Sequence, residues 1–243
     1  MESALHFDIA AQPDFTTCGP TCLQAVYRFF GDELPLKDVI EQTARLEDGG
    51  TLAALLGNHA LARGYQVTIH TYNLYVFDPT WFRDGAPPLQ QKLRAQADVK
   101  QNARLQIATG AYLDFLRSGG AIRMDDLTGT LLRRYLKRGV PILTGLSSTY
   151  LYGEPREFGD PARPDDVRGD PQGHFVVLCG YDSIERAVLV ADPLHPNPLA
   201  GHTRKYTIPL DRLICAIMLG IVTFDANLLA IEPKRVRGSP PAH

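Results

Sequence analysis

A cysteine between a turn-forming segment and a helical pattern is the feature that most constrains this chain. Residues 12–17 are polar and turn-forming, and the apolar residues after Cys18 recur at helical spacing until Gly31. The pattern predicts a helix over residues 18–30 with Cys18 at its N-terminus. Unpaired N–H groups and the positive end of the helix dipole at such a position favour the thiolate, which is the nucleophilic form of cysteine.

A cysteine nucleophile needs a base, and His174 is the best candidate. It lies in the stretch 173–182, which predicts a buried strand ending in a turn. A second strand is predicted over residues 187–193, with Asp192 near its C-terminal end. Because neighbouring antiparallel strands can bring these two side chains together, Cys18, His174 and Asp192 are predicted to act as nucleophile, base and orienting carboxylate.

Gln12 is predicted to supply an oxyanion donor six residues before the cysteine, together with the backbone N–H of Cys18. Asp182, on the turn after the first strand, is the alternative orienter. Each main candidate also has an ordinary structural interpretation. These are a buried apolar thiol for Cys18, a core histidine for His174, a turn carboxylate for Asp192 and a solvated amide for Gln12.

The remaining cysteines are expected to be structural and reduced. Cys22 lies one helical turn after Cys18 and is predicted to pack, as are Cys179 and Cys215 in their apolar surroundings. A zinc site made by Cys18, Cys22, His174 and Asp192 is the alternative, but the further ligand pairs typical of structural zinc are missing. Neither a metal nor another cofactor is therefore predicted.

Two other groups of residues are assigned to the surface and to the core. His195 and His202 flank a turn rich in Pro and Gly and are expected at the surface. The aromatic cluster in residues 72–81 is expected in the core; its members are Tyr72, Tyr75, Phe77 and Trp81.

Composition sets the class of the protein and its partners. The chain has 243 residues, 44% of them hydrophobic, which suits one large globular domain. A formal net charge of -2 gives no reason to expect nucleic acid, and no apolar run is long enough to predict membrane insertion. The N-terminus lacks the basic and apolar regions of a secretory signal, so a cytoplasmic location is the default expectation. The oligomeric state is not predicted.

The order of elements predicts an α+β fold, with helices first and antiparallel strands second. Helices are expected at 35–45, 51–63, 89–116 with a break near Gly110, and 125–138, with a helical turn at 209–214. Further strands are expected at 5–9, 65–72, 140–146, 204–208 and 216–224. One domain is predicted over 1–225, with a helical lobe at 1–139 and a β lobe at 140–225. A C-terminal extension is predicted over 226–243, its end mobile from residue 232.

The loop 147–172 is too long for a plain connection and leads directly into His174. It is predicted to be a lid or a substrate wall.

The residues around Cys18, His174 and Asp192, in this order and with Gln12 six residues before the cysteine, resemble the bacteriocin-processing cysteine peptidases of family thirty-nine. Those enzymes cut after double-glycine leaders and belong to the papain-like superfamily. The resemblance implies a stand-alone relative with a papain-like fold. In that fold a helical lobe packs on an antiparallel β-sheet lobe, and the active site lies in the cleft between them.

The expected function is therefore a cysteine peptidase or amidase that acts on a peptide or protein substrate through a thioester acyl-enzyme. The phytochelatin synthases are similar in the Gln-to-Cys spacing and in the Cys, His, Asp order. An acyltransferase or transpeptidase is accordingly one alternative. A peptide-binding module without catalysis, on the same fold, is the other.

Overall fold

The computed structural model describes residues 3–46, 49–159 and 162–234. The helices are α1 (Cys18–Phe29), α2 (Leu36–Gln42), α3 (Ala53–Ala62), η1 (Pro79–Phe82), α4 (Leu89–Val99), α5 (Ala103–Arg117), α6 (Gly129–Leu136), α7 (Ser148–Tyr152), α8 (Leu210–Leu219) and η2 (Gly220–Thr223). The strands are β1 (Ser3–Ala4), β2 (Tyr65–Thr71), β3 (Ala121–Arg123), β4 (Ile142–Ser147), β5 (Glu157–Phe158), β6 (Arg163–Pro164), β7 (Gly173–Asp182), β8 (Ala187–Ala191), β9 (Lys205–Pro209) and β10 (Asn227–Pro233).

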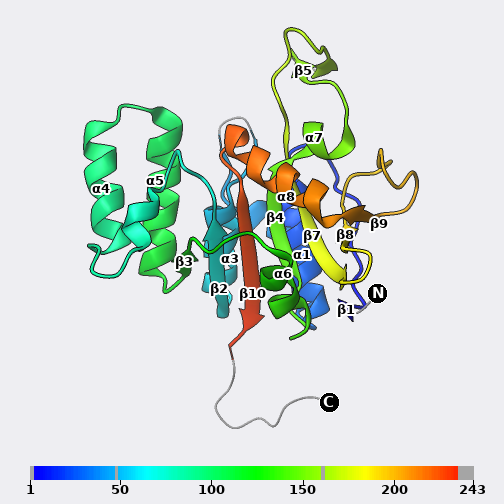
Figure 1. The fold of residues 1–243 in the computed structure, drawn as a ribbon, viewed down its shortest axis with the longest axis horizontal. Helices are drawn as coiled ribbons and strands as arrows, with labels where there is room; N and C mark the ends of the chain where they lie inside the picture. The colour runs from blue at the N-terminus through cyan, green and yellow to red at the C-terminus, as the bar shows by residue number, and fades with distance from the viewer. Residues whose placement is uncertain (1–2, 47–48, 160–161, 235–243) are drawn as a thin grey trace.

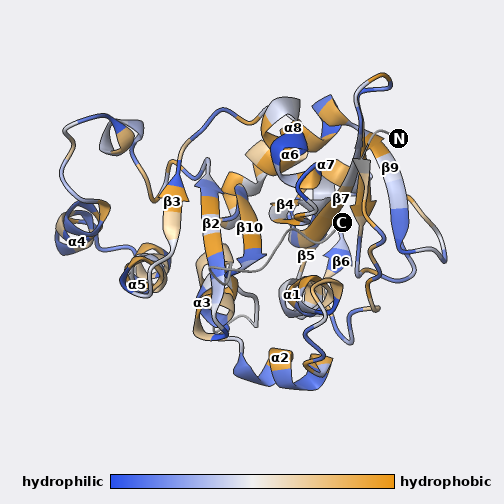
Figure 2. Cartoon of the chain, turned by 90° about the horizontal axis from the view of Figure 1, so that it is seen from below, coloured by the Kyte–Doolittle hydropathy of each residue, from blue (hydrophilic) through white to orange (hydrophobic). Residues whose placement is uncertain are grey.

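One mixed sheet carries the fold, in the order β3-β2-β10-β4-β7-β8-β9, with β1 paired to β7. All its pairings are antiparallel except that of β2 with β3. Helices cover both faces, with α1 and α3 on one and α6 and α8 on the other (Figures 1 and 2). The predicted α+β class is therefore confirmed, and the helices and the sheet form three layers.

Strand β7 shows why the centre of this sheet is buried on both sides. Phe175 and Val177 belong to the hydrophobic core on the α1 face, whereas Val176 and Leu178 belong to the core on the α8 face. Because successive side chains of a strand point to opposite faces, a continuous apolar run is what a strand covered on both faces requires. This packing fixes the start of β7, where His174 lies.

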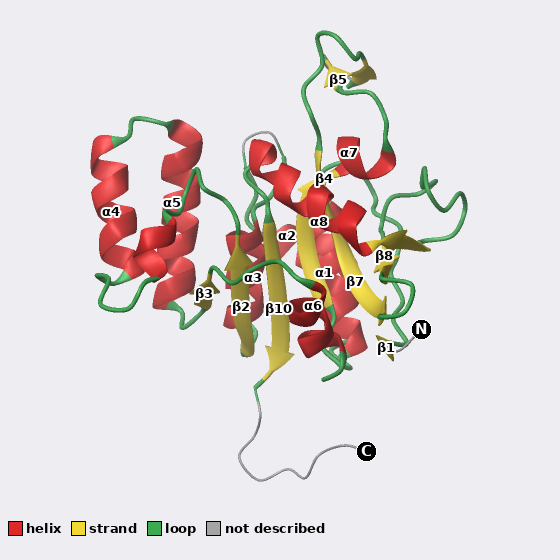
Figure 3. Ribbon diagram, viewed as in Figure 1, coloured by secondary structure: helices red, strands yellow, loops and turns green. Residues whose placement is uncertain are grey.

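The predicted C-terminal boundary is wrong. The domain expected over 1–225 does not end there, because β10 lies in the middle of the sheet, hydrogen-bonded to β2 on one side and β4 on the other. The division into a helical lobe at 1–139 and a β lobe at 140–225 fails for the same reason, since β2 and β3 belong to the common sheet (Figure 3). The mobile end predicted from residue 232 starts inside β10, and residues 235–243 lie outside the described residues.

Three predicted elements also differ from the structure. Residues 216–224, expected as a strand, complete helix α8 and form η2, because Leu213, Ala216 and Ile217 bury one helical face. The long helix expected over 89–116 breaks at residues 100–102 rather than at Gly110. Asn102 caps α5 at this break, because its side chain accepts the N–H of Leu105. The loop 147–172 contains the helix α7 and the β5–β6 hairpin.

The longest helix in the described ranges is α5, with 15 residues. Within those ranges every helix is too short or too polar to cross a bilayer.

Candidate active site

Helix α1 begins at Cys18, as predicted, and packs its N-terminal turn against the start of β7. The preceding turn is held by Asp14, whose carboxylate accepts the N–H of Thr16 at 2.8 Å. Gly19 allows close packing, because a Cβ there would lie 2.6 Å from Thr51 and 3.3 Å from Phe175. Cys18 is 9% exposed. The Cys18 thiol therefore lies at the N-terminus of α1, the helix that packs against β7.

His174 and Asp192 meet at the edge of the sheet where β7 begins and β8 ends. Val177 is paired with Ala191, so Asp192 follows β8 opposite Val176, and His174 lies two residues away on the same face. His174 Nε2 is 2.8 Å from Asp192 Oδ1, and the two residues are 6% and 0% exposed. The predicted neighbouring strands therefore bring these two residues together, and Nδ1 is left for a second partner.

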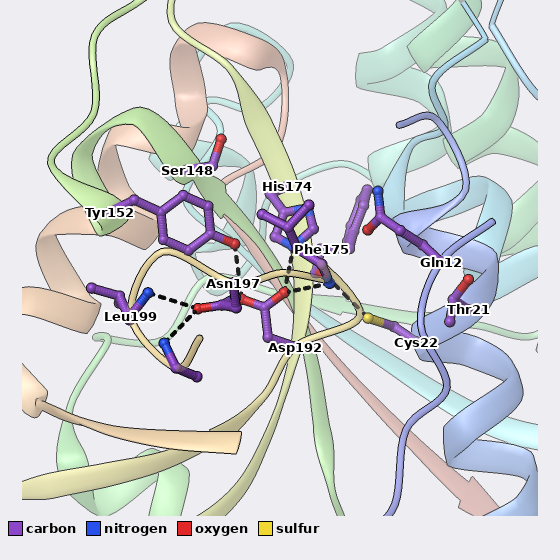
Figure 4. A network of polar contacts seen from close by, with 12 residues as sticks. Gln12, Thr21, Cys22, Ser148, Tyr152, His174, Phe175, Asp192, Asn197 and Leu199 are labelled. Carbon is purple, nitrogen blue, oxygen red and sulfur yellow. Dashed lines mark hydrogen bonds and ion pairs between the residues drawn. The ribbon is translucent and has the colours of Figure 1, made fainter. Parts of the chain in front are cut away.

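Asp192 accepts four hydrogen bonds from the described residues. Its Oδ2 accepts the hydroxyls of Tyr152 at 2.8 Å and Tyr206 at 2.7 Å. Its Oδ1 accepts the N–H of Leu194 at 3.0 Å as well as the His174 ring. Figure 4 shows Tyr152 and Asp192 on one side of His174, with Gln12 and Cys22 on the other. A buried carboxylate with this many donors is held ionised and in one orientation.

The buried pair sets the protonation of both partners. Burial would raise the pKa of Asp192, but the His174 charge and the hydrogen bonds it accepts outweigh this and hold the pKa below 3.8. Burial would lower the pKa of His174, but the Asp192 charge and hydrogen bond, with a further hydrogen bond and charge interaction from Cys18, raise it to about 10. The imidazole is therefore a cation at neutral pH, with the Asp192 carboxylate as its counter-charge.

This linkage predicts how stability depends on pH. The raised His174 pKa contributes stability that is fully present below pH 6.5 and is lost as the pH rises through about 10. The lowered Asp192 pKa contributes stability that is present above pH 3.8 and is lost as the pH falls through the folded value. We expect the unfolding free energies of wild type and His174→Gln to differ most near pH 5–6 and to converge toward pH 10, as measured by urea titration. A difference that stays constant from pH 6 to pH 10 would contradict the assignment.

The two tyrosines at Asp192 were missed by sequence reasoning. Tyr206 lies in β9, where β8 pairs it with Val190, and a hydroxyl at a buried strand position is the signal that it needs a polar partner. Tyr152 gave no such signal, because it lies in the segment expected to be a loop. Both tyrosines have pKa values raised well above 10, mainly by burial and then by the Asp192 charge, so both remain hydrogen-bond donors.

Removing either hydroxyl should lower the stability of the protein without unfolding it. We expect Tyr206→Phe and Tyr152→Phe each to cost about 1.5–3 kcal/mol of unfolding free energy, because a hydrogen bond to a buried charge is lost. The His174 pKa should rise, since the carboxylate loses a competing donor. The control is Tyr150→Phe on the same helix, whose side chain is 39% exposed and lies against Arg212. Equal effects of all three changes on chemical denaturation would contradict the network.

Gln12 is anchored by its backbone, since its N–H donates to Pro193 O at 2.9 Å and ties the segment before α1 to the residue after Asp192. Its side-chain Nε2 donates to Asp14 O at 2.9 Å, whereas Oε1 is enclosed without a hydrogen-bond partner among the described residues. The Gln12 amide thus lies near His174 (Figure 4), but its acceptor Oε1 is the buried atom and its donor Nε2 is already bonded to Asp14 O. Its oxyanion role stays a prediction.

The other cysteines separate into buried and exposed thiols, and all four are free. Cys22 is buried, donates to Phe175 O at 3.2 Å and has a pKa raised well above 9.0, chiefly by burial. Cys179 is also buried, and burial raises its pKa to about 12. Cys215, expected in the core, is exposed, because α8 turns Leu213 and Ala216 inward and Cys215 outward.

The remaining candidates are a turn carboxylate, two histidines and an aromatic cluster. Asp182 ends β7 and accepts the N–H groups of Ile184 and Glu185, which is a turn function. His195 and His202 are exposed, as expected. Of the aromatic cluster, Tyr72 and Phe77 are buried, Trp81 is partly buried and Tyr75 is exposed. In the described part of the chain, no group of three or more His, Cys, Asp or Glu side chains is placed to hold a metal ion.

A cavity of about 600 Å³ lies under the segment expected to be a lid or wall. The segment contributes most of its lining, and α8 and η2 contribute the rest; the residues are Ser147, Thr149, Tyr150, Gly153, Glu154, Arg156, Pro171, Arg212, Leu219 and Val222. None of these residues is Cys18, His174 or Asp192, so the wall function stays a prediction.

Comparison with known proteins gives one family and several distant structures. Residues 108–209 match the Peptidase_C39 like family, which confirms the resemblance seen in the sequence. This span contains His174 and Asp192 and excludes Cys18 and Gln12. No curated protein matches the chain at a significant level.

Three solved structures are similar over most of their length. A double glycine motif protease from an AMS/PCAT transporter, solved in complex with the leader peptide, is 13% identical, with 96% of each chain covered and a TM-score of 0.46. The peptidase domain of Streptococcus ComA is 13% identical, with 94% of this chain and 100% of that one covered and a TM-score of 0.44. Xylellain, a cysteine protease from Xylella fastidiosa, is 17% identical, with coverages of 96% and 86% and a TM-score of 0.48.

Proposed function

We propose that this chain, whose residues 108–209 belong to the Peptidase_C39 like family, is a cysteine peptidase or amidase that cleaves a peptide substrate through a thioester. The observation that carries the proposal is the buried His174–Asp192 pair, 2.8 Å between Nε2 and Oδ1, whose imidazole also interacts with Cys18 at the N-terminus of α1. A helix N-terminus and an imidazolium together stabilise a thiolate, and a thiolate is the species that attacks a carbonyl.

In the proposed first step the Cys18 sulfur attacks the carbonyl carbon and the carbonyl oxygen takes the negative charge. The N–H groups at the start of α1 support that oxygen, and half a turn of the Gln12 amide would bring its NH₂ into the enclosed position now held by Oε1. The His174 imidazolium then gives its proton to the leaving nitrogen, the C–N bond breaks and the acyl group stays on sulfur.

In the second step neutral His174 takes a proton from water, whose oxygen attacks the thioester carbon. The C–S bond breaks, the acid product leaves and the Cys18 thiolate is restored. Asp192 keeps the ring orientation through both steps, because its second oxygen is fixed by Tyr152 and Tyr206. If an amine rather than water attacks the same thioester, the product is a new amide.

The test is to incubate the protein with a diverse library of peptides and measure both cleavage and the intact mass. We expect peptide cleavage and an acyl adduct on the tryptic peptide that contains Cys18. Adding glycine amide as a nucleophile separates hydrolysis from acyl transfer by the mass of the product. Peptide binding without cleavage or adduct, unchanged in Cys18→Ser, would contradict the proposal and support a binding module.

A further inference from the structure

A second buried carboxyl group lies at the same edge of the sheet as His174. Asp225 connects η2 to β10 and is 5% exposed. Its Oδ2 accepts the Thr223 hydroxyl at 3.1 Å, and its N–H donates to Gly220 O at 3.0 Å. Its Oδ1 is enclosed and has no hydrogen-bond partner among the described residues. A buried carboxyl oxygen without a hydrogen-bond partner lowers the stability of the folded protein, so its retention indicates a function.

The sheet makes room for this carboxyl group through two glycines. A Cβ on Gly145 of β4 would lie 2.8 Å from Asp225 Oδ1, and a Cβ on Gly173 of β7 would lie 2.7 Å from Oδ2. Gly145 and Phe175 are paired in the sheet, so both glycines face the α1 side, as Phe175 does. Gly173 immediately precedes His174. The Asp225 carboxyl group therefore lies so close to the backbone of Gly173 that any other residue at position 173 would clash with it.

The backbone around Asp225 is held in an unfavourable conformation. Phe224 and Ala226, on either side of it, have φ angles of 65° and 59°, in the left-handed region that residues with a Cβ rarely adopt. Three contacts keep Phe224 there: Asn73 Nδ2 donates to its carbonyl at 3.0 Å, Tyr75 stacks on its ring, and Arg104 lies over the same ring. Two such residues on either side of a buried acid are typical of a functional site.

Three ionisable groups face the carboxyl group from the elements packed against it. Arg104 and Tyr112 come from α5, and His174 comes from β7. Burial is the main influence and raises the pKa of Asp225 to about 7, while the Thr223 hydrogen bond and then the charges of Arg104 and His174 oppose the rise. Asp225 is therefore neutral in acid and becomes a carboxylate as the pH rises through neutrality.

We propose that Asp225 is a positioning residue of the candidate active site that acts through His174, supporting the protonated imidazole from the Gly173 side while Asp192 supports it from the other. As a carboxylate it favours the imidazolium, and as a neutral acid it does not. Its ionisation thus keeps the proton on His174 to higher pH. The consequence for catalysis rests on the proposed function, whereas the electrostatic coupling does not.

The direct test is to follow the titration of His174 by NMR in protein labelled with ¹³C-histidine. The chain has 7 histidines, and His174→Gln identifies the signal. In Asp225→Asn we expect the His174 midpoint to fall by about one pH unit. Thr223→Val removes a hydrogen bond that favours the carboxylate, so the inflection that Asp225 imposes should move to higher pH without disappearing. The control is Asp98→Asn on α4, an exposed carboxylate on a helix that lies to one side of the sheet (Figure 1).

A second measurement separates the charge from simple loss of packing. Since burial raises the Asp225 pKa from 3.8 to about 7, its ionisation destabilises the folded protein increasingly from pH 4 to pH 7 and fully above that. Asp225→Asn should therefore raise the melting temperature more at pH 8 than at pH 5, by at least about 4 °C. A stabilised variant with a lowered His174 midpoint supports the proposal.

An unchanged His174 midpoint in Asp225→Asn would overturn this proposal. An equal change in Asp98→Asn would do the same, because the coupling would then be unspecific. Absence of peptide cleavage in the wild type, with the midpoint shift present, would contradict the proposed function and leave the coupling in place. The two failures are therefore distinguishable.

Discussion

Cys18→Ala should remove peptide cleavage while leaving the fold intact. We expect kcat/KM to fall by about 10⁴-fold or more, because a nucleophile that acts as a unit with its base is not replaced by either partner alone. Among the described residues, no hydrogen bond joins the Cys18 side chain to the backbone of α1, and Ala is the residue most favourable to helices. The urea midpoint should therefore change little. The measurement is cleavage of the best library peptide, with circular dichroism on the same samples.

The matched controls are the other thiols. Cys215→Ala makes the same chemical change at an exposed position on α8 and should leave cleavage unaffected. Cys22→Ala removes a buried thiol that donates to Phe175 O, so it should lower stability yet retain cleavage. If Cys18→Ala cleaves as fast as Cys215→Ala, Cys18 is not the nucleophile.

Asp192→Ala should have the largest effect on stability of any change at the site. It leaves the His174 imidazolium buried without its counter-charge, and Tyr152 and Tyr206 lose the acceptor of their hydroxyls. Breaking one partner out of a buried pair costs about 3–5 kcal/mol. Cleavage should also fall by about 10²–10⁴-fold, since the ring is no longer oriented. Urea unfolding and kcat/KM, both at pH 6, give the two effects.

The control for Asp192→Ala is Asp211→Ala, which breaks an exposed ion pair with Arg186. Exposed pairs contribute little, so this variant should behave as wild type. A second variant, Asp192→Asn, keeps the shape and separates charge from packing. If both Asp192 variants lose stability but keep cleavage, Asp192 stabilises the fold and does not orient His174 for catalysis.

The parts of the fold with strong local signals were predictable from sequence. Helix α1 was expected over residues 18–30 and is found at Cys18–Phe29, because turn, apolar spacing and terminal glycine all indicate the same element. The strand with His174 was predictable because its apolar run is bounded by turn residues. The short connection made the pairing of β7 with β8 predictable, but not the register shift between Leu178 and Gly180 that places Asp192 on the same face as His174.

The parts that depend on distant contacts were not predictable. Strand β10 follows an apolar stretch read as the last strand, and its partners β2 and β4 lie far away in the sequence. That preceding stretch, residues 216–224, is apolar enough for either a strand or a helix, and only packing against β4 decides for α8 and η2. The carboxyl group of Asp225, between them, was missed for the same reason.

The candidate site divides in the same way. Its nucleophile, base and orienter lie in segments with clear patterns, whereas Tyr152 and Tyr206 join them only through the fold. The orientation of the Gln12 amide is a matter of one torsion angle, which no sequence pattern specifies.

If His174 holds Cys18 as a thiolate, iodoacetamide at pH 6 should alkylate Cys18 rapidly, as measured by peptide mapping of samples taken over time. Cys215 is exposed and Cys18 is buried, so access to the reagent alone would favour alkylation of Cys215. We expect Cys18 to react at least about 10-fold faster than Cys215, and His174→Gln to abolish this advantage. A Cys18 that reacts no faster than Cys215 in the folded wild-type protein would contradict this expectation.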